Sequence, residues 1–216
     1  MDSYSEKDAF AEMKTGAVIV AHPDDETLWS GGAILSHPQI NWIILTLCRK
    51  SDPNRAPKFL KVANILGAKG FMADLDDGPD QKPLEQSDVQ QTILNTLPQK
   101  SFDIILTHSP KGEYTRHLRH EEVSQAVFSL WSQGKLKAKR LLLFAYEDGG
   151  RKYPPRPIEN ADIVIKPAKN VLQSKKDIII SSYGFSPDSF EAKAVSKTEA
   201  FWLIEKPDDI KKISEK

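Results

Sequence analysis

Short apolar runs alternate with amphipathic segments along most of the chain. The runs at 16–21, 42–48, 70–73, 102–107, 140–146 and 162–165 are typical of buried strands. Three segments between them repeat apolar residues at helical spacing, with faces made by Phe59, Val62, Ala63 and Leu66, by Val89, Ile93, Leu94 and Leu97, and by Val123, Val127, Leu130 and Trp131. Alternating strands and helices predict an α/β fold with a Rossmann-like, doubly wound and mostly parallel sheet flanked by helices.

The length of 216 residues suits one domain over 1–216. A turn-rich stretch at 149–157 leads into a C-terminal portion from about 150, where a weaker helical pattern covers 171–180. We expect this portion to form a lid or a rim on the α/β domain.

Charge and cysteine content narrow the function. The chain has 30 basic and 30 acidic residues, so no global basic field favours nucleic acid. The lone cysteine, Cys48, excludes an intrachain disulfide and favours a cytoplasmic location. No apolar stretch approaches the roughly 18 residues needed to span a membrane. A small-molecule substrate is therefore expected, and the pattern leaves homo-oligomerisation open.

A polar cluster follows the first predicted strand directly. Residues 21–26 read Ala-His-Pro-Asp-Asp-Glu, which places His22, Asp24 and Asp25 at the carboxyl end of that strand. Ligands of open parallel sheets collect in the crevice outside these ends. The cluster therefore lies where α/β enzymes keep their chemistry.

A second polar stretch follows the strand that ends at Thr107. It holds His117 and His120, which share one face on the opening turn of a helix. Three ligands, His22, Asp25 and His120, with one open position match the rule for catalytic zinc. His108 ends the strand in the same crevice, where hydrogen bonding beside the ligands and core packing are equally good interpretations.

These residues also carry a family resemblance. The 21–26 motif, the trailing Gly31-Gly32 and the segment from Thr107 to His120 resemble the PIG-L/LmbE family of zinc-dependent N-acetylglucosaminyl deacetylases, over about 14–126. The resemblance implies that His22, Asp25 and His120 bind the zinc and that Asp24 is the general base. It implies further that His117 stabilises the oxyanion and that Arg55 contacts the substrate.

The sequence departs from the family pattern at two places. The family's second motif usually reads His-Pro-Asp-His, whereas residues 117–120 here read His-Leu-Arg-His. With that aspartate absent, a nearby cation is expected to lower the pKa of His117 unless Glu113, Glu121 or another carboxylate substitutes. Lys58 stands where the family often has an acid after the arginine, so that part of the substrate site differs.

Several residues have simpler interpretations. Asp24 is also a favoured helix N-cap residue, and Glu26 suits a structural role or the orientation of a ligand. Close helix packing explains Gly31 and Gly32 better than phosphate binding does. Cys48 lies in a strand pattern and is expected to be an inert buried thiol.

The sequence thus predicts a zinc-dependent hydrolase that removes an N-acetyl group from an N-acetylglucosamine-type conjugate, using metal-activated water and an aspartate base. The metal choice stays open between Zn²⁺ and another divalent ion such as Fe²⁺. Alternatives are an amidase acting on another small N-acyl compound or a thiol-sugar conjugate, and a non-catalytic sugar-binding module. A magnesium-dependent phosphoryl-transfer enzyme would explain the paired carboxylates but not the histidines.

Overall fold

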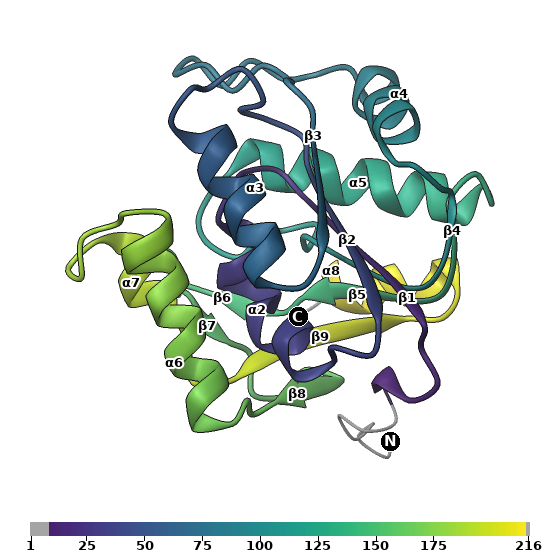
Figure 1. Cartoon of the computed structure of the whole chain (residues 1–216). Helices are drawn as coiled ribbons and strands as arrows, with labels where there is room; N and C mark the ends of the chain where they lie inside the picture. The colour runs from purple at the N-terminus through teal and green to yellow at the C-terminus, as the bar shows by residue number, and fades with distance from the viewer. Residues whose placement is uncertain (1–8, 215–216) are drawn as a thin grey trace.

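A seven-stranded sheet with order β3-β2-β1-β4-β5-β9-β8 forms the centre of the molecule in the computed structural model, which describes residues 9–214 (Figure 1). Its strands are β1 (Thr15–Val20), β2 (Asn41–Thr46), β3 (Lys69–Met72), β4 (Ser101–Thr107), β5 (Lys137–Phe144), β8 (Ile163–Ile165) and β9 (Glu199–Ile204). The first five strands run parallel, whereas β9 pairs antiparallel with both β5 and β8. The predicted mostly parallel sheet is confirmed.

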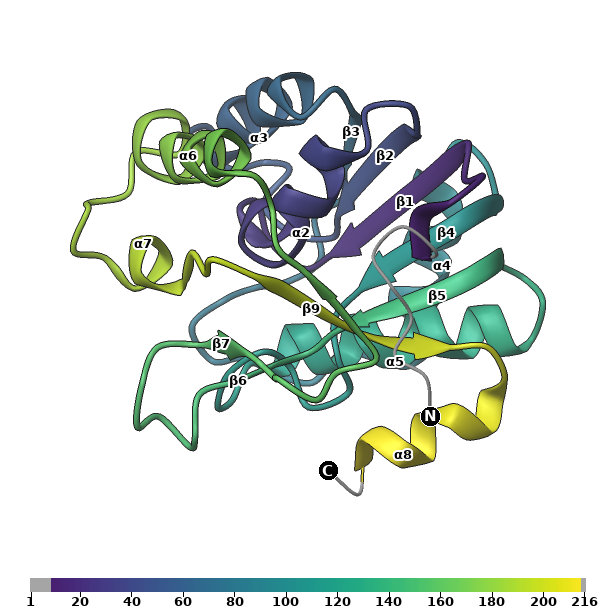
Figure 2. The same cartoon turned by 90° about the horizontal axis from the view of Figure 1, so that it is seen from below.

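Helices cover both faces of this sheet (Figure 2). One face carries α2 (Asp25–Ser36), α3 (Arg55–Ile65) and α6 (Lys169–Asp177), and the other carries α4 (Gln86–Thr96), α5 (Leu118–Ser132) and α8 (Ile210–Ser214). The smaller elements are β6 (Tyr146–Glu147), β7 (Arg156–Pro157), the π-helical turn η1 (Ile178–Ser182), α7 (Phe190–Ala194) and the 3₁₀ turn η2 (Pro207–Asp209). The molecule is therefore a three-layer α/β structure.

The core explains why the strands read as continuous apolar runs. In β1, Val18 and Val20 pack into one hydrophobic cluster, while Ala17 and Ile19 pack into the cluster on the other side of the sheet. Because successive side chains of a strand point to opposite faces, a strand covered on both sides needs apolar residues at every position.

Two sequence-based expectations about the strands need correction. The run predicted at 140–146 begins earlier, because β5 extends from Lys137 to Phe144. The strand β9 was not predicted at all. It begins with a charged residue, Glu199, which does not signal the start of a buried strand. Its pairing with β5 depends on residues some 60 positions away, which local patterning does not reveal.

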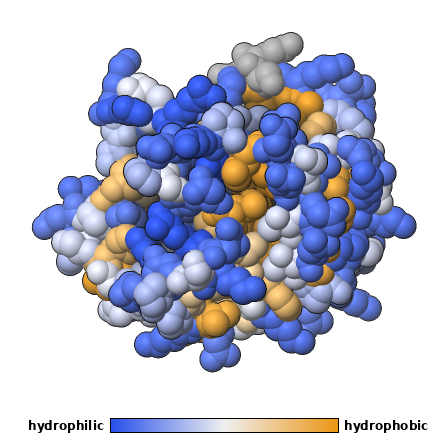
Figure 3. All heavy atoms as spheres, turned by 90° about the horizontal axis from the view of Figure 1, so that it is seen from above, coloured by the Kyte–Doolittle hydropathy of each residue, from blue (hydrophilic) through white to orange (hydrophobic). Residues whose placement is uncertain are grey.

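The face of the protein shown in Figure 3 is mostly hydrophilic, with a band of hydrophobic residues near its centre. The large hydrophobic side chains recorded as exposed in the described part of the chain are Leu60, Ile65, Val164 and Phe190. Between residues 9 and 214, no helix combines the length and the apolar character that a membrane span requires.

A buried ion pair ties the C-terminal portion to α2. Lys175 Nζ lies 2.5 Å from Glu199 Oε1, and both side chains are fully buried. The Glu199 carboxylate also accepts the backbone N–H groups of Gly32, at 2.7 Å, and Ala33, at 2.8 Å. Buried charges are tolerated when they are paired and hydrogen-bonded in this way.

Gly32 is expected to tolerate no larger residue. A Cβ atom there would lie 2.5 Å from Pro167 Cγ and 2.9 Å from Glu199 Oε1. We expect Gly32→Ala to lower the free energy of unfolding by about 1–3 kcal/mol, the usual cost of overpacking. Urea denaturation measures this change.

The neighbouring glycine supplies a matched control in the same helix. A Cβ at Gly31 would approach no atom closer than 3.4 Å, so Gly31→Ala should be neutral or should gain up to about 1 kcal/mol from helix propensity. Equal losses in the two variants would contradict the close-packing interpretation.

Candidate metal centre and active site

The candidate site lies at the carboxyl edge of the parallel strands. The loops after β1, β3 and β4 meet there around a cavity of about 250 Å³, whose walls include His22, Asp24, Asp25, Arg55, His117 and Phe190. Five of the six predicted site residues thus lie on the cavity wall. The sixth, His120, does not line the cavity but stacks on His117.

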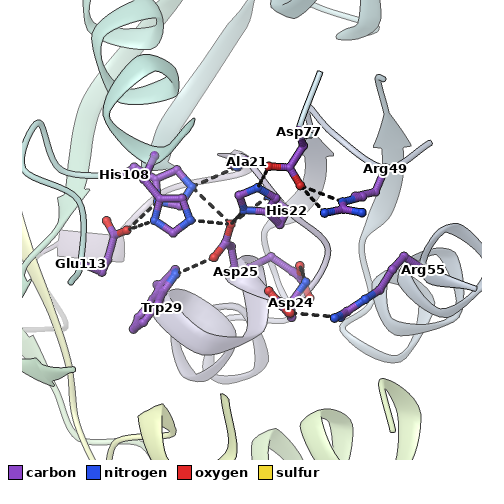
Figure 4. Close-up of polar contacts among 12 residues, drawn as sticks. Ala21, His22, Asp24, Asp25, Trp29, Arg49, Arg55, Asp77, His108 and Glu113 are labelled. Atoms are coloured by element: carbon purple, nitrogen blue, oxygen red, sulfur yellow. Dashed lines mark hydrogen bonds and ion pairs between the residues drawn. The ribbon is translucent and has the colours of Figure 1, made fainter. Parts of the chain in front are cut away.

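Asp25 occupies the centre of a histidine cluster (Figure 4). Its Oδ2 lies 3.2 Å from His22 Nδ1, 3.5 Å from His108 Nε2 and 3.3 Å from His120 Nε2. Trp29 Nε1 donates to the other carboxylate oxygen at 2.9 Å. Burial opposes ionisation of Asp25, but His120 and the other histidines outweigh it and hold its pKa well below the usual value. The carboxylate is therefore ready to bind a cation.

His120 has one ring nitrogen engaged and one free for a ligand. Its Nδ1 lies 2.6 Å from Glu113 Oε2, which fixes the ring. Its Nε2 is buried and has no hydrogen-bond partner. Burial opposes ionisation of Glu113, but His108 and His120 outweigh it and lower the pKa of Glu113 to about 2. A carboxylate behind a histidine is the usual support of a metal ligand.

His22 has the same kind of support from a residue that the sequence did not reveal. Its Nε2 lies 3.2 Å from Asp77 Oδ1, while Nδ1 faces Asp25. Burial opposes protonation of His22, but the hydrogen bonds to Asp25 and Asp77 raise its pKa. Ligand atoms of His22, His117 and His120 lie within 4.8 Å of one another.

His108 resembles a ligand by position but not by bonding. Its Nε2 accepts the backbone N–H of Ala21 at 3.0 Å, and its Nδ1 lies 2.8 Å from Glu113 Oε2. Both ring nitrogens are therefore used within the protein. The ring also stacks on His120, with centroids 3.9 Å apart. Both interpretations of His108 hold, since it is hydrogen-bonded beside the candidate ligands and packed in the core.

The donor set fits a divalent transition metal. His22, Asp25 and His120 supply two imidazoles and a carboxylate, the ligand types that zinc accepts, and the buried Nε2 of His120, which faces Asp25 at 3.3 Å without a hydrogen bond, would gain a bond to the metal. Within the described residues, the sets whose ligand atoms all lie within 4.8 Å of one another are His22 with His117 and His120, His22 with Cys48 and Asp77, and Asp25 with His108 and His120. The predicted set combines members of the first and third, since Asp25 Oδ2 lies 3.2 Å from His22 and 3.3 Å from His120, and the bond from Ala21 occupies His108.

Asp24 does not cap the following helix with its side chain. It stands at the N-cap position with a φ of 114°, but no side-chain capping bond forms. Its Oδ2 instead lies 3.2 Å from Arg55 Nη1 (Figure 4). Burial and the neighbouring carboxylates of Asp25 and Glu26 raise its pKa well above the usual value. The capping interpretation is wrong, and the carboxylate is left facing the cavity.

Glu26 supports Asp24 through the backbone. It accepts the backbone N–H of Asp24 at 3.0 Å and the hydroxyl of Tyr183 at 2.7 Å. The hydrogen bonds of its carboxylate go to Asp24, Thr27 and Tyr183 and to none of the three candidate metal ligands, so the structural interpretation of Glu26 holds. Tyr183 comes from the C-terminal portion, which thereby contributes to the shape of the segment that joins β1 to α2.

His117 has a lowered pKa, in the expected direction but for another reason. Burial is the largest cause, the positive charges of His120 and His22 are the next, and together they lower the pKa of His117 to about 3. None of the substitutes considered from sequence reaches it, because Glu113 holds His108 and His120 while Glu121 pairs with Arg116. At neutral pH His117 is therefore a neutral imidazole.

Arg119, which replaces the family's aspartate, is buried and turned away from His117. It donates to the carbonyl oxygens of Asp76, at 2.6 Å, and Lys82, at 2.8 Å, and pairs with Glu122 at 2.6 Å. The arginine thus holds the loop that carries Asp77 against α5. A signal for Asp77 existed in the sequence, since Asp76-Asp77-Gly78 follows the third strand at the same sheet edge.

The substrate side of the cavity contains two arginines. The guanidinium of Arg55 lies over the ring of Phe185, 4.6 Å from its centroid, and Arg49 pairs with Asp77 through Nε at 2.8 Å. Arg55 is thus where the resemblance places it, although its contact with a substrate stays a prediction. Lys58 does not line the cavity.

The chain therefore has an α/β fold with a buried histidine–carboxylate cluster at the carboxyl edge of its parallel strands. Residues 17–131 match the family model described as PIG-L, GlcNAc-PI de-N-acetylase. The chain belongs to this family and is an enzyme of the deacetylase and amidase type.

The chain is also similar to known proteins at low sequence identity. A protein of Acanthamoeba polyphaga mimivirus, described as uncharacterized, is 23% identical over 182 residues, which cover 78% of this chain and 75% of that protein. N,N′-diacetylchitobiose deacetylase from Pyrococcus horikoshii has a TM-score of 0.67 at 15% identity, over 91% of this chain and 85% of its own.

Two further solved structures show how widely the fold is used. The zinc-inhibited form of teicoplanin deacetylase has a TM-score of 0.63 at 12% identity, over 88% of this chain and 97% of its own. The 4-carboxy-2-hydroxymuconate hydratase GalB from Pseudomonas putida has a TM-score of 0.61 at 14% identity, over 89% of this chain and 96% of its own. Because a hydratase shares the fold, the reaction has to be argued from the site.

Proposed function

We propose that the protein is a metal-dependent hydrolase that removes the acetyl group from the nitrogen of an N-acetylglucosamine-type conjugate. The observation that carries the metal site is the buried Nε2 of His120, which makes no hydrogen bond and lies 3.3 Å from Asp25 Oδ2, while Glu113 holds the other ring nitrogen. The family match supports the reaction type.

His22, Asp25 and His120 would hold the metal, with Asp77 and Glu113 orienting the two histidines. Zinc suits two imidazoles and one carboxylate, and Fe²⁺ is the alternative to be tested. A divalent ion bound there supplies Lewis acidity, which lowers the pKa of a ligated water toward about 7 and polarises the acyl carbonyl.

Asp24 is the proposed general base. It lines the cavity beside Asp25, its backbone N–H is held by Glu26, and its carboxylate has a raised pKa that favours uptake of a proton from water. Arg55 keeps this carboxylate in place through the 3.2 Å contact and is the proposed substrate contact.

His117 is the proposed group for the developing oxyanion. As a neutral imidazole it donates one N–H to the oxyanion without the cost of a buried positive charge. Its Nδ1 is buried and has no partner, so this ring has hydrogen-bonding capacity to spare. Transfer of a proton to the leaving amine would use the proton that Asp24 has accepted, with His117 assisting.

The substrate class is tested with a panel of compounds that each contain an amide bond to be cleaved. Metal-loaded protein is incubated with N-acetylglucosamine glycosides, a cysteinyl-sugar conjugate and an acyclic N-acetyl amine, and free amine and acid are quantified. Release from the glycosides supports the proposal. Release only from the thiol conjugate or the acyclic compound favours the alternative amidase, and binding without release favours the sugar-binding module.

The same proposal includes the organisation of the chain. Residues 1–216 would work as one domain in the cytoplasm, with the portion from about 150 as the rim of the site. The burial of the free thiol of Cys48, whose pKa is raised by burial, is consistent with a reducing compartment.

A further inference from the structure

One wall of the cavity comes from the C-terminal portion. The short helix α7 contributes Phe190 and Glu191, and the Phe190 side chain is 45% exposed. Most of the other lining side chains carry a charge or an imidazole. Trp29 is fully buried, so it cannot offer its face to a ligand. Phe190 is therefore an accessible aromatic surface in an otherwise polar cavity.

The position of this ring is fixed from two sides. Phe190 packs edge-on against Tyr114, with centroids 5.1 Å apart and planes at 71°. The helix itself begins at Ser189, whose Oγ accepts the N–H of Ala192 at 3.1 Å, and Ala194 at its other end is fully buried. Tyr114 in turn contacts His117 edge-on at 5.8 Å. Phe190 is thus connected to the catalytic side of the cavity through one intervening ring.

We propose that Phe190 is the specificity-determining residue that stacks on the apolar face of the substrate's pyranose ring. This inference rests on the proposed function and adds the group that selects a sugar over other N-acyl compounds. A pyranose has C–H groups on its faces and hydroxyls around its edge, so an aromatic face can cover the former while polar groups meet the latter. Glu191, next to Phe190, is an acceptor for those hydroxyls.

The size of the cavity agrees with a single ring. Its volume of about 250 Å³ falls below the ~300–1,000 Å³ that is common for drug-sized ligands. A monosaccharide unit with its N-acetyl group fills such a space, and any conjugated group would extend past the rim. Loss of the stacking surface should therefore weaken recognition of the ring and leave the amide chemistry intact.

The test compares two substrates that have the same N-acetyl group. One is methyl N-acetylglucosaminide and the other is N-acetylethanolamine, which has no ring. For Phe190→Ala we expect KM for the glycoside to rise roughly 3- to 10-fold, in line with the usual strength of aromatic contacts, with little change in kcat. The kinetics for the acyclic substrate should not change. Phe190→Tyr keeps the aromatic face and should stay near wild type.

Lys193→Ala is the matched control, since Lys193 is exposed on the same helix but does not line the cavity. Calorimetric titration of the glycoside into the wild type and Phe190→Ala adds a reading that needs no turnover. An unchanged KM and Kd for the glycoside, or an equal loss on both substrates, would overturn the proposal for Phe190.

The outcomes separate this inference from the proposed function. Wild-type protein that binds the glycoside through Phe190 but releases no acetate refutes the deacetylase function and supports the stacking surface. Release of acetate at a rate that does not depend on Phe190 supports the deacetylase function and refutes the stacking surface. Wild-type protein that neither binds nor cleaves the glycoside refutes both.

Discussion

Asparagine in place of Asp24 is expected to lower kcat by about 10²–10⁴-fold, the usual contribution of a general base. Asparagine keeps the shape of the side chain but accepts no proton from water. The metal ligands are not altered, so the metal content per chain should equal that of the wild type. Steady-state kinetics on the best substrate of the panel, with elemental analysis of the same samples, measure both quantities.

Asp80→Asn is the matched control for this change. Asp80 is an exposed carboxylate that lies outside the cavity lining, so its replacement alters charge by the same amount without touching the site. Loss of metal in Asp24→Asn, to the extent seen when a ligand is removed, would refute the assignment of Asp24 as base rather than ligand.

Alanine in place of His120 is expected to remove both the metal and the activity. His120 offers a buried nitrogen that makes no hydrogen bond and faces Asp25, and three protein ligands are the usual minimum for a catalytic zinc site. Wild-type protein purified without chelators or metal-affinity columns should contain about one divalent ion per chain, and the variant should contain little. Elemental analysis distinguishes zinc from iron in the same measurement.

His120 is fully buried, so the folding of the variant has to be checked independently. The Tm of the wild type should rise with added zinc, because a ligand that binds only the folded state stabilises it, and the Tm of a folded His120→Ala should not. His37→Ala is the control for loss of a histidine elsewhere, since His37 stacks on Phe10 at the end of α2. Wild-type protein that contains no metal, even after reconstitution, would refute the hydrolase mechanism.

The sequence was sufficient for the part of the site that local order determines. His22, Asp24 and Asp25 follow β1 within five residues, and His117 stacks on His120 as predicted, although it is the extended N-cap residue of α5 rather than part of the helical turn. The rule that ligands collect at the carboxyl ends of parallel strands then joins the two loops. The shared position of the two loops at this edge of the sheet, rather than any single motif, predicted that they converge.

The supporting residues could not be found in this way because their roles depend on long-range packing. Asp77 reaches His22 across 55 positions in the chain. The sequence marked Arg119 as a lost aspartate, whereas in the structure it fixes the loop of Asp77 from α5. Phe190 belongs to a segment without strong periodicity, and only the folded chain shows that it forms a wall of the cavity.

The antiparallel insertion of β9 has a consequence for how the protein is made. β8 is translated before β9, and the pairing described for β8 is with β9, which itself lies against β5. A nascent chain that has emerged only through α6 carries Lys175 without Glu199 and a β8 segment without its neighbour in the sheet. The five parallel strands can associate during synthesis, while the ion pair of Lys175 with Glu199, which anchors the wall that holds Tyr183 and Phe190, forms only once β9 has left the ribosome. Completion of this wall of the cavity is therefore coupled to the synthesis of β9.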